Sequence, residues 1–209
     1  MPQLPTAPVT PSRKRLHTRT ILLEGYKRDD GLFDIEARLA DVKDHDYAMP
    51  TGMWRKGEPM HHMQVRLTID HQFNILAAHA DFLAAPYTGC PDIAPDYGKI
   101  VGLNLLRGFR RQVSKLFADA AGCAHVTELL SSLPTAAIQA LSSERKESNS
   151  DGGAKPPHLD RCHELVTTGA TVKCYYPRWY RETESGGQVV PEISSGSNLQ
   201  RARKMHEDP

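Results

Sequence analysis

Two stretches of the sequence combine histidines with other groups that can move protons. In the first, Gly57–Asp70, the adjacent residues His61 and His62 open a segment that alternates like a β-strand. Neighbouring strand residues point to opposite faces, so one histidine can face the core and the other solvent. A histidine at a strand end suits proton transfer, because modest changes of environment move its pKa across neutrality. The alternative is a structural histidine that only completes a hydrogen bond, and base rates favour it for His62.

The second stretch, Gly122–Leu130, lies at the expected start of a helix. Cys123 would meet unpaired backbone amides there, which favour a thiolate. His125 and Glu128 are three residues apart and share a helical face, so the carboxylate can orient the imidazole and the two can act as acid or base. The alternative is that Cys123 packs as a small apolar side chain and Glu128 offsets the helix dipole.

Carboxylates also gather in the first expected hairpin. Asp34 and Glu36 share one face of their strand, so a groove over that face would meet both. Charges at this density would be costly if buried without partners, and we expect most of them on the solvated face.

The cysteines and histidines raise the question of a zinc site. Cys123 and His125 are close in sequence, as are Cys162 and His163, but the spacings do not match a known finger or ribbon. Only pairs that the fold brings together could build a metal site, so the sequence assigns no residue as a metal ligand.

These residues must be positioned by strands that come first and helices that come later. Period-two alternation predicts strands over 17–28, 32–42, 62–70 and 73–82, and helical spacing predicts helices over 109–120, 125–141 with a bend at Pro134, and 159–166. This order, without βαβ alternation, predicts an α+β fold with a mostly antiparallel sheet of two hairpins and helices packed on one face.

Composition sets the domain limits and excludes some partners. Residues 1–16 are a proline-rich leader, 17–181 a single domain with a mobile loop at 144–157, and 182–209 a polar tail that we expect to be disordered. Lysine and arginine total 26 against 25 acidic residues, so no overall field favours nucleic acid. No apolar run has the length of a signal peptide core or a membrane span, so we expect a cytoplasmic protein whose four cysteines are thiols.

Four separated motifs, read in order, resemble one known family over about residues 17–180. They are Glu24–Glu36, Gly57–Asp70, Gly122–His125 and the pair Cys162-His163, and they resemble the bacterial domain-of-unknown-function family 2889. His62 and Cys174 depart from its pattern. The positions that match it are His17, Arg19, Tyr26, Arg28, Asp34, Glu36, His61, Arg66, Asp70, Cys123, His125, Glu128 and Cys162.

The resemblance implies a reaction, because some relatives occur in bacteria that degrade lignin and one resembles a phenylcoumaran γ-formaldehyde lyase. It implies a cofactor-independent carbon–carbon lyase that takes a small aromatic substrate and releases formaldehyde from a hydroxymethyl side chain by acid–base catalysis. The base would be His61 or His125 and its orienting partner Asp34 or Glu128. Arg28 or Tyr26 would stabilise a phenolate, and Arg66 would bind substrate.

Two other classes of function stay open. A binding or scaffold protein would use the histidines and cysteines only in core hydrogen bonds and would show no turnover. A metal-dependent hydrolase would bring Cys and His ligands together through the fold. We expect no nucleic acid or membrane partner, and a homodimer is an open alternative.

Overall fold

The computed structural model describes residues 11–142, 144 and 155–182, and the chain divides into two compact units, residues 1–151 and 152–209. The expected leader, loop and tail fall largely outside the described residues.

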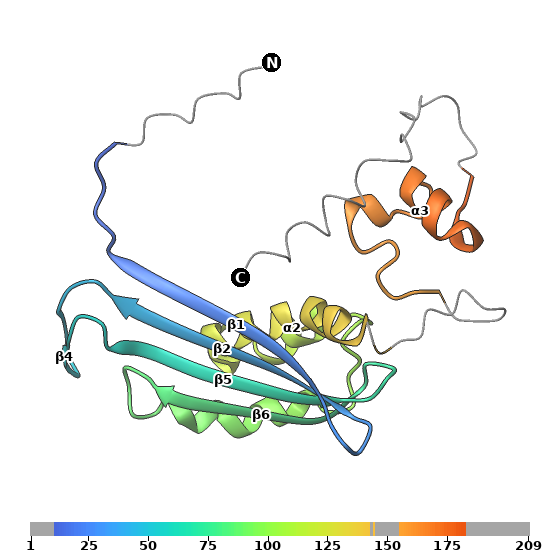
Figure 1. Cartoon of the computed structure of the whole chain (residues 1–209). Coiled ribbons are helices and arrows are strands. Elements are labelled where there is room, and N and C mark those ends of the chain that lie inside the picture. The colour runs from blue at the N-terminus through green and yellow to red at the C-terminus, as the bar shows by residue number, and fades with distance from the viewer. Residues whose placement is uncertain (1–10, 143, 145–154, 183–209) are drawn as a thin grey trace. The chain divides into compact units, whose positions relative to one another are not determined.

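The first unit is built on a four-stranded antiparallel sheet (Figure 1). Its strands are β1 His17–Lys27, β2 Phe33–Lys43, β5 Pro59–Ile69 and β6 Ile75–Ala84, in the spatial order β1-β2-β5-β6. The two expected hairpins are therefore joined through β2 and β5. Alternating apolar residues on these central strands bury one face, as the sequence predicts.

A second, smaller sheet lies in the connection from β2 to β5. It pairs β3 Tyr47–Met49 with β4 Gly52–Trp54, and Gly52 takes a φ of 136° that a side chain would rarely tolerate. This hairpin is not predicted from the sequence, because three-residue strands are too short to show a period.

The helices follow the sheet in the chain. They are the 3₁₀ helix η1 Cys90–Ile100, α1 Phe109–Leu116, the 3₁₀ turn η2 Asp119–Ala121 and α2 Ala124–Ser142. Helix α2 contacts β1, β2 and β5 and continues through Pro134 as one element. It comes so close to β1 that a Cβ on Gly25 would lie 2.3 Å from the Cβ of Ala140, so only glycine fits there.

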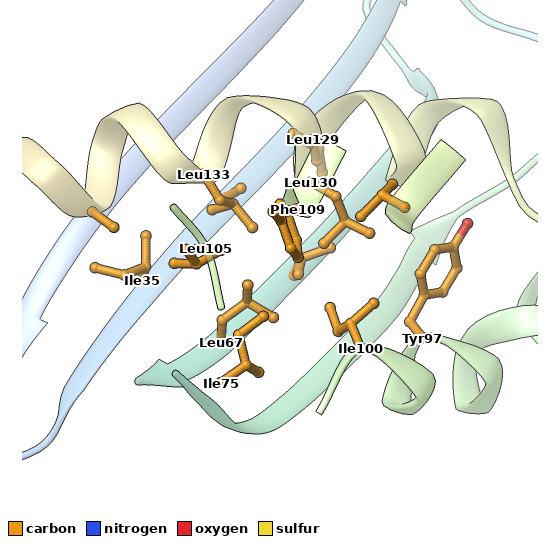
Figure 2. Packing of buried hydrophobic residues seen from close by; sticks show 14 of the residues in the cluster. Ile35, Leu67, Ile75, Tyr97, Ile100, Leu105, Phe109, Leu129, Leu130 and Leu133 are labelled. Atoms are coloured by element: carbon orange, nitrogen blue, oxygen red, sulfur yellow. The ribbon is translucent and has the colours of Figure 1, made fainter. Parts of the chain in front are cut away.

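The core lies between the sheet and these helices. Figure 2 shows Leu129, Leu130 and Leu133 of α2 directed toward the apolar side chains of the strands, with Ile100 and Tyr97 of η1 beside them. Burial of these apolar side chains supplies most of the driving force for folding. The arrangement confirms the α+β class with helices on one face of the sheet.

The second unit is described over 155–182 and holds short elements only: η3 His163–Leu165, α3 Ala170–Tyr175 and η4 Pro177–Trp179. The helix predicted over 159–166 is wrong, because this segment is turns and one 3₁₀ turn. Asp160 accepts hydrogen bonds from the backbone N–H and the hydroxyl of Thr167, which hold the turn instead.

None of the helices in the described ranges is both long enough and apolar enough to span a membrane.

Candidate active site

A row of polar side chains crosses three strands at one end of the sheet. Arg19 of β1 is directly opposite Asp41 of β2, and Asp41 is directly opposite His61 of β5. Asp41 continues the inward alternation of β2, so the row lies on the face that the helices cover. The register of β2 with β5 shifts right after Asp41, and such bulges re-aim side chains beside functional sites.

Asp41 is the centre of this row. Its side chain is 3% exposed and takes two hydrogen bonds from the Arg19 guanidinium, Nε to Oδ1 and Nη2 to Oδ2, each 2.8 Å. The Nε2 atom of His17 lies 3.0 Å from Oδ1, and Arg19 reaches on through Nη1 to Glu128 Oε2 at 2.5 Å. A buried carboxylate requires such partners, because burying it unpaired would be costly.

Two histidines meet the same oxygen of Asp41. His61 Nδ1 lies 3.2 Å and His125 Nε2 3.4 Å from Oδ2, and the two imidazole rings stack with their centroids 3.9 Å apart. His61 Nδ1 is fully buried yet makes no directed hydrogen bond, since its contact with Asp41 has ion-pair distance without hydrogen-bond geometry.

The start of α2 places His125 over the row. The Tyr97 hydroxyl accepts a hydrogen bond from the Cys123 N–H at 2.7 Å and donates one to the Cys123 carbonyl at 3.1 Å, which fixes the turn before the helix. A Cβ on Gly122 would lie 2.6 Å from the Cβ of Phe117, so glycine is needed in this turn. The Cys123 Sγ then lies 3.8 Å from His125 Nδ1.

The pKa values of these groups favour one charged carboxylate beside neutral imidazoles. Burial raises the pKa of Asp41, but the hydrogen bonds and charge of Arg19, helped by His17 and His125, outweigh it and lower the pKa overall. Burial lowers the pKa of His61, and the neighbouring His125 lowers it further. Burial and the charge of Arg19 lower the pKa of His125. A neutral imidazole next to an anion can accept a proton.

We call this set of residues the Asp41 cluster. It consists of His17, Arg19, Asp41, His61, His125 and Glu128.

The structure brings His61, His125 and Glu128 together, as the sequence predicts, but it changes the role of Glu128. Its carboxylate is about half exposed and pairs with Arg19. Asp41, not Glu128, holds the imidazole of His125. The expectation that Glu128 orients His125 is therefore corrected, because the strand supplies a nearer and more buried carboxylate.

Asp34, Tyr26, Arg28 and Arg66 lie apart from the cluster. Asp34 is on the outward side of β2, where it accepts hydrogen bonds from Thr68 Oγ1 at 2.7 Å and Arg28 Nη1 at 3.3 Å. Tyr26 is opposite Asp34 in the register and shares its face. Strand alternation thus separates these residues from Asp41, and the expectation that Asp34 orients a histidine is corrected.

The outward face carries its own set of ion pairs, which we call the open-face network. Glu36 takes hydrogen bonds from Arg66 Nε at 2.8 Å and Arg38 Nη2 at 3.0 Å. Its members are Glu24, Arg28, Asp34, Glu36, Arg38 and Arg66.

Asp41, the central residue, is not among the site residues predicted from the sequence. A usable signal exists, because the inward positions of β2 read Phe33, Ile35, Ala37 and Leu39 before the carboxylate interrupts them. A charged residue at the next inward position must be paired, and that requirement points to a polar site.

Asp41, His61 and His125 are also the one group among the described residues whose donor atoms could hold a metal ion. Each offers one donor atom, and these atoms lie within 4.8 Å of one another. The group contains no cysteine, and all four cysteines are free thiols. Among the described residues, the candidate metal ligands are therefore a carboxylate and two imidazoles, and not the cysteines of the earlier alternative.

An apolar hollow of about 720 Å³ lies between the small hairpin and the last residues of β6. Met53 and Trp54 line it on one side and Phe82, Pro86 and Tyr87 on the other. The hairpin connects β2 just after Asp41 to β5 just before His61, so the hollow is at the same end of the sheet as the cluster.

Comparison with known proteins gives one match. The model of a family described as "Protein of unknown function (DUF2889)" matches residues 17–139, which include every residue of the Asp41 cluster. No curated protein matches, and no solved structure matches.

Proposed function

Because the chain belongs to the DUF2889 family, whose name gives no activity, we propose from the site itself that the Asp41 cluster is the active site of a lyase. The lyase releases formaldehyde from the hydroxymethyl side chain of a lignin-derived phenolic dimer such as a phenylcoumaran.

The reaction needs a base and a partner for a leaving phenolate. The base removes the hydroxyl proton, and the O–H electron pair forms the C=O bond of formaldehyde as the carbon–carbon bond breaks. The electrons of that bond form the double bond of a stilbene, and the aryl ether oxygen leaves as a phenolate that takes up a proton. No electrons enter or leave, so the balance requires no redox cofactor.

The observation that carries the proposal is the contact of His61 with Asp41. Nδ1 of His61 lies 3.2 Å from Oδ2 of the carboxylate, at ion-pair distance, so the other ring nitrogen, Nε2, is left to accept the proton of the alcohol. The carboxylate then stabilises the imidazolium that forms. His125 is less suited to be the base, because its second nitrogen already faces Cys123.

Positive charge for the phenolate comes from Arg19 in this proposal. Its guanidinium is one-third exposed and is held by both Asp41 and Glu128, so it is fixed in place before substrate binds. Arg28 and Tyr26, the residues that the resemblance implies for this task, lie with the open-face network.

The apolar hollow supports an aromatic substrate. Its size is in the range of pockets that take ligands of this kind, and its aromatic walls suit a ring. A ring bound between Trp54 and Tyr87 would lie at the end of the sheet where His61 is.

The test is incubation of the purified chain with a panel of phenolic dimers that carry a hydroxymethyl group. Formaldehyde and stilbene should form in equal amounts. The variant His61→Ala should lose turnover, and His79→Ala, an exposed histidine paired with Asp81 on the outward side of β6, should keep it.

Absence of formaldehyde from every dimer, with the chain shown to be folded, would reject the lyase. A loss of less than about tenfold in turnover for His61→Ala and His125→Ala would reject the assignment of the site, because general base catalysis contributes more than this. A chain that binds the dimers without turnover would instead be a binding protein.

A further inference from the structure

The three donor atoms at the centre of the cluster form a triangle that points to a bound ion. We infer that Asp41 Oδ2, His61 Nδ1 and His125 Nε2 bind one divalent cation of the zinc class. The role of the ion rests on the proposed function, whereas its binding does not. A zinc-bound Nδ1 leaves the ring proton on Nε2, so with the ion in place His61 is a ligand, and the ion replaces it in activating the alcohol by lowering the pKa of the hydroxyl, whose proton passes to solvent.

The distances fit the coordination sphere of such an ion. Zinc takes nitrogen and oxygen ligands at about 2.0–2.2 Å in a tetrahedron, whose ligand-to-ligand edges are then about 3.3 Å. The Oδ2 atom of Asp41 lies 3.2 Å from His61 Nδ1 and 3.4 Å from His125 Nε2. Two edges of the triangle therefore already have tetrahedral length.

The hydrogen bonding of the site also leaves room for an ion. Nδ1 of His61 is buried without a directed hydrogen bond, and a buried polar atom in that state requires an explanation. A metal ligand needs no proton on this nitrogen, and coordination would satisfy it.

Charge favours a cation at this point. The carboxylates of Asp41 and Glu128 face one guanidinium, that of Arg19, so their three charges sum to minus one. A divalent cation beside Oδ2 would offset this excess. Two imidazoles and one carboxylate favour zinc and its neighbours over magnesium or calcium, which take oxygen ligands.

Neighbouring side chains hold the ligand Asp41 in place. Arg19 donates to both oxygens of Asp41 and His17 Nε2 lies near Oδ1, so the carboxylate is held with Oδ2 beside the two imidazoles. Such outer contacts fix the orientation of ligands in metal sites. Three protein ligands leave a fourth position open, where an ion could bind the hydroxyl of the substrate and ease the loss of its proton.

The experiment is a calorimetric titration of the chelator-treated full chain with zinc chloride. We expect one zinc ion per chain. Changes in an outer shell cost about 10–100-fold in affinity, so Asp41→Asn, His61→Ala and His125→Ala should each weaken binding by at least about 100-fold.

Control variants distinguish this site from nonspecific zinc binding by exposed side chains. Cys162 and Cys174 are exposed thiols, so the double variant Cys162→Ser/Cys174→Ser and the variant His79→Ala should bind zinc as the wild type does. If a ligand variant does not fold, His61→Gln and His125→Gln are tested in its place, with zinc-dependent thermal stabilisation as the readout.

Each outcome decides the inference. No zinc binding by the folded wild type, or unchanged binding in the ligand variants, overturns it. Formaldehyde release is measured on the same metal-free and zinc-loaded samples. Zinc binding without formaldehyde release keeps the metal site and rejects the lyase. Formaldehyde release by a chain that binds no zinc keeps the lyase and rejects the metal site.

Discussion

Both faces of the four-stranded sheet carry ionised side chains, and they use them differently. In the open-face network, carboxylates and guanidiniums alternate across β1, β2 and β5, and Arg38 and Arg66 are nearly half exposed. In the Asp41 cluster, one buried carboxylate is surrounded by a guanidinium and three imidazoles. The first arrangement balances charge, whereas the second places imidazole nitrogens, whose protonation can change, around one carboxylate.

The two faces differ in how strongly water screens their charges. Exposed pairs are screened by water and contribute little to stability. Helix α2 shields the Asp41 cluster from water, so a single substitution there should change the pKa values and hydrogen bonds of the remaining groups. Substitutions on the two faces should therefore separate turnover from stability.

The largest expected effect is on turnover in the cluster. His61→Ala should slow formaldehyde release by about 10²–10⁴-fold, the usual contribution of general acid–base catalysis. His125→Ala removes the imidazole that stacks on His61 and shares its carboxylate oxygen, and it should slow release by at least about tenfold. Both side chains are partly exposed, so the fold should persist, which circular dichroism would check. Normal turnover in either variant would contradict the assignment of the chemistry to the Asp41 cluster.

Arg19→Met should give the largest loss of stability. It removes two charge-assisted hydrogen bonds from Asp41 and leaves the carboxylate buried, which costs about 1.5–3 kcal/mol for a bond to a charged group. Urea unfolding at neutral pH measures the change. The double variant Arg19→Met/Asp41→Asn should recover part of it, and strictly additive losses would contradict the coupling.

Tyr97→Phe tests how α2 is anchored over the row. It leaves the buried N–H of Cys123 without its acceptor, at a cost of about 1–3 kcal/mol. Because the same turn positions His125, turnover should fall as well. Tyr175→Phe, which changes an exposed tyrosine that does not line the hollow, is the matched control and should leave stability and turnover unchanged.

Arg66→Met tests the open face. Its pair with Glu36 is half exposed on the arginine side, so we expect a loss of at most about 1 kcal/mol and no change in turnover. A tenfold fall in formaldehyde release would mean that the open face binds substrate, as the sequence analysis expects for Arg66.

The smallest effect concerns acid stability at the β1–β2 turn. The hydrogen bond from Arg28 and that from the Leu32 N–H lower the pKa of Asp30 below its ordinary value of 3.8. A carboxyl whose folded pKa is lowered adds stability above its unfolded pKa and loses it as the pH falls through the folded pKa. Asp30→Asn should therefore flatten the fall in stability below about pH 4. An unchanged acid slope in urea unfolding would contradict this.

The sequence predicts much of the fold because alternation on β2 and β5 and helical spacing around Leu129 are strong periodic signals. It predicts less of the short elements, where β3, β4 and α3 span too few residues to carry a period. His61 and His125 were found from their neighbours in sequence. Their common partner Asp41 was not, because the register that sets it opposite Arg19 and His61 is a property of paired strands.

The separation of the predicted site residues has the same cause. Asp34 and Asp41 lie on one strand seven residues apart, and an odd spacing sends them to opposite faces. The period of two fixes the faces within one strand but does not relate Asp34 to histidines on other elements, so the sequence predicts a single site where the structure has two charged regions.

The most direct test of the Asp41 cluster as the active site is formaldehyde release by Asp41→Asn beside Arg66→Met, at equal concentrations of folded protein. We predict that Asp41→Asn loses at least about 100-fold in turnover, because its histidines lose their anion, and that Arg66→Met keeps the wild-type rate. Equal rates for wild type and Asp41→Asn, or a loss confined to Arg66→Met, would contradict the account and move the chemistry to the open face.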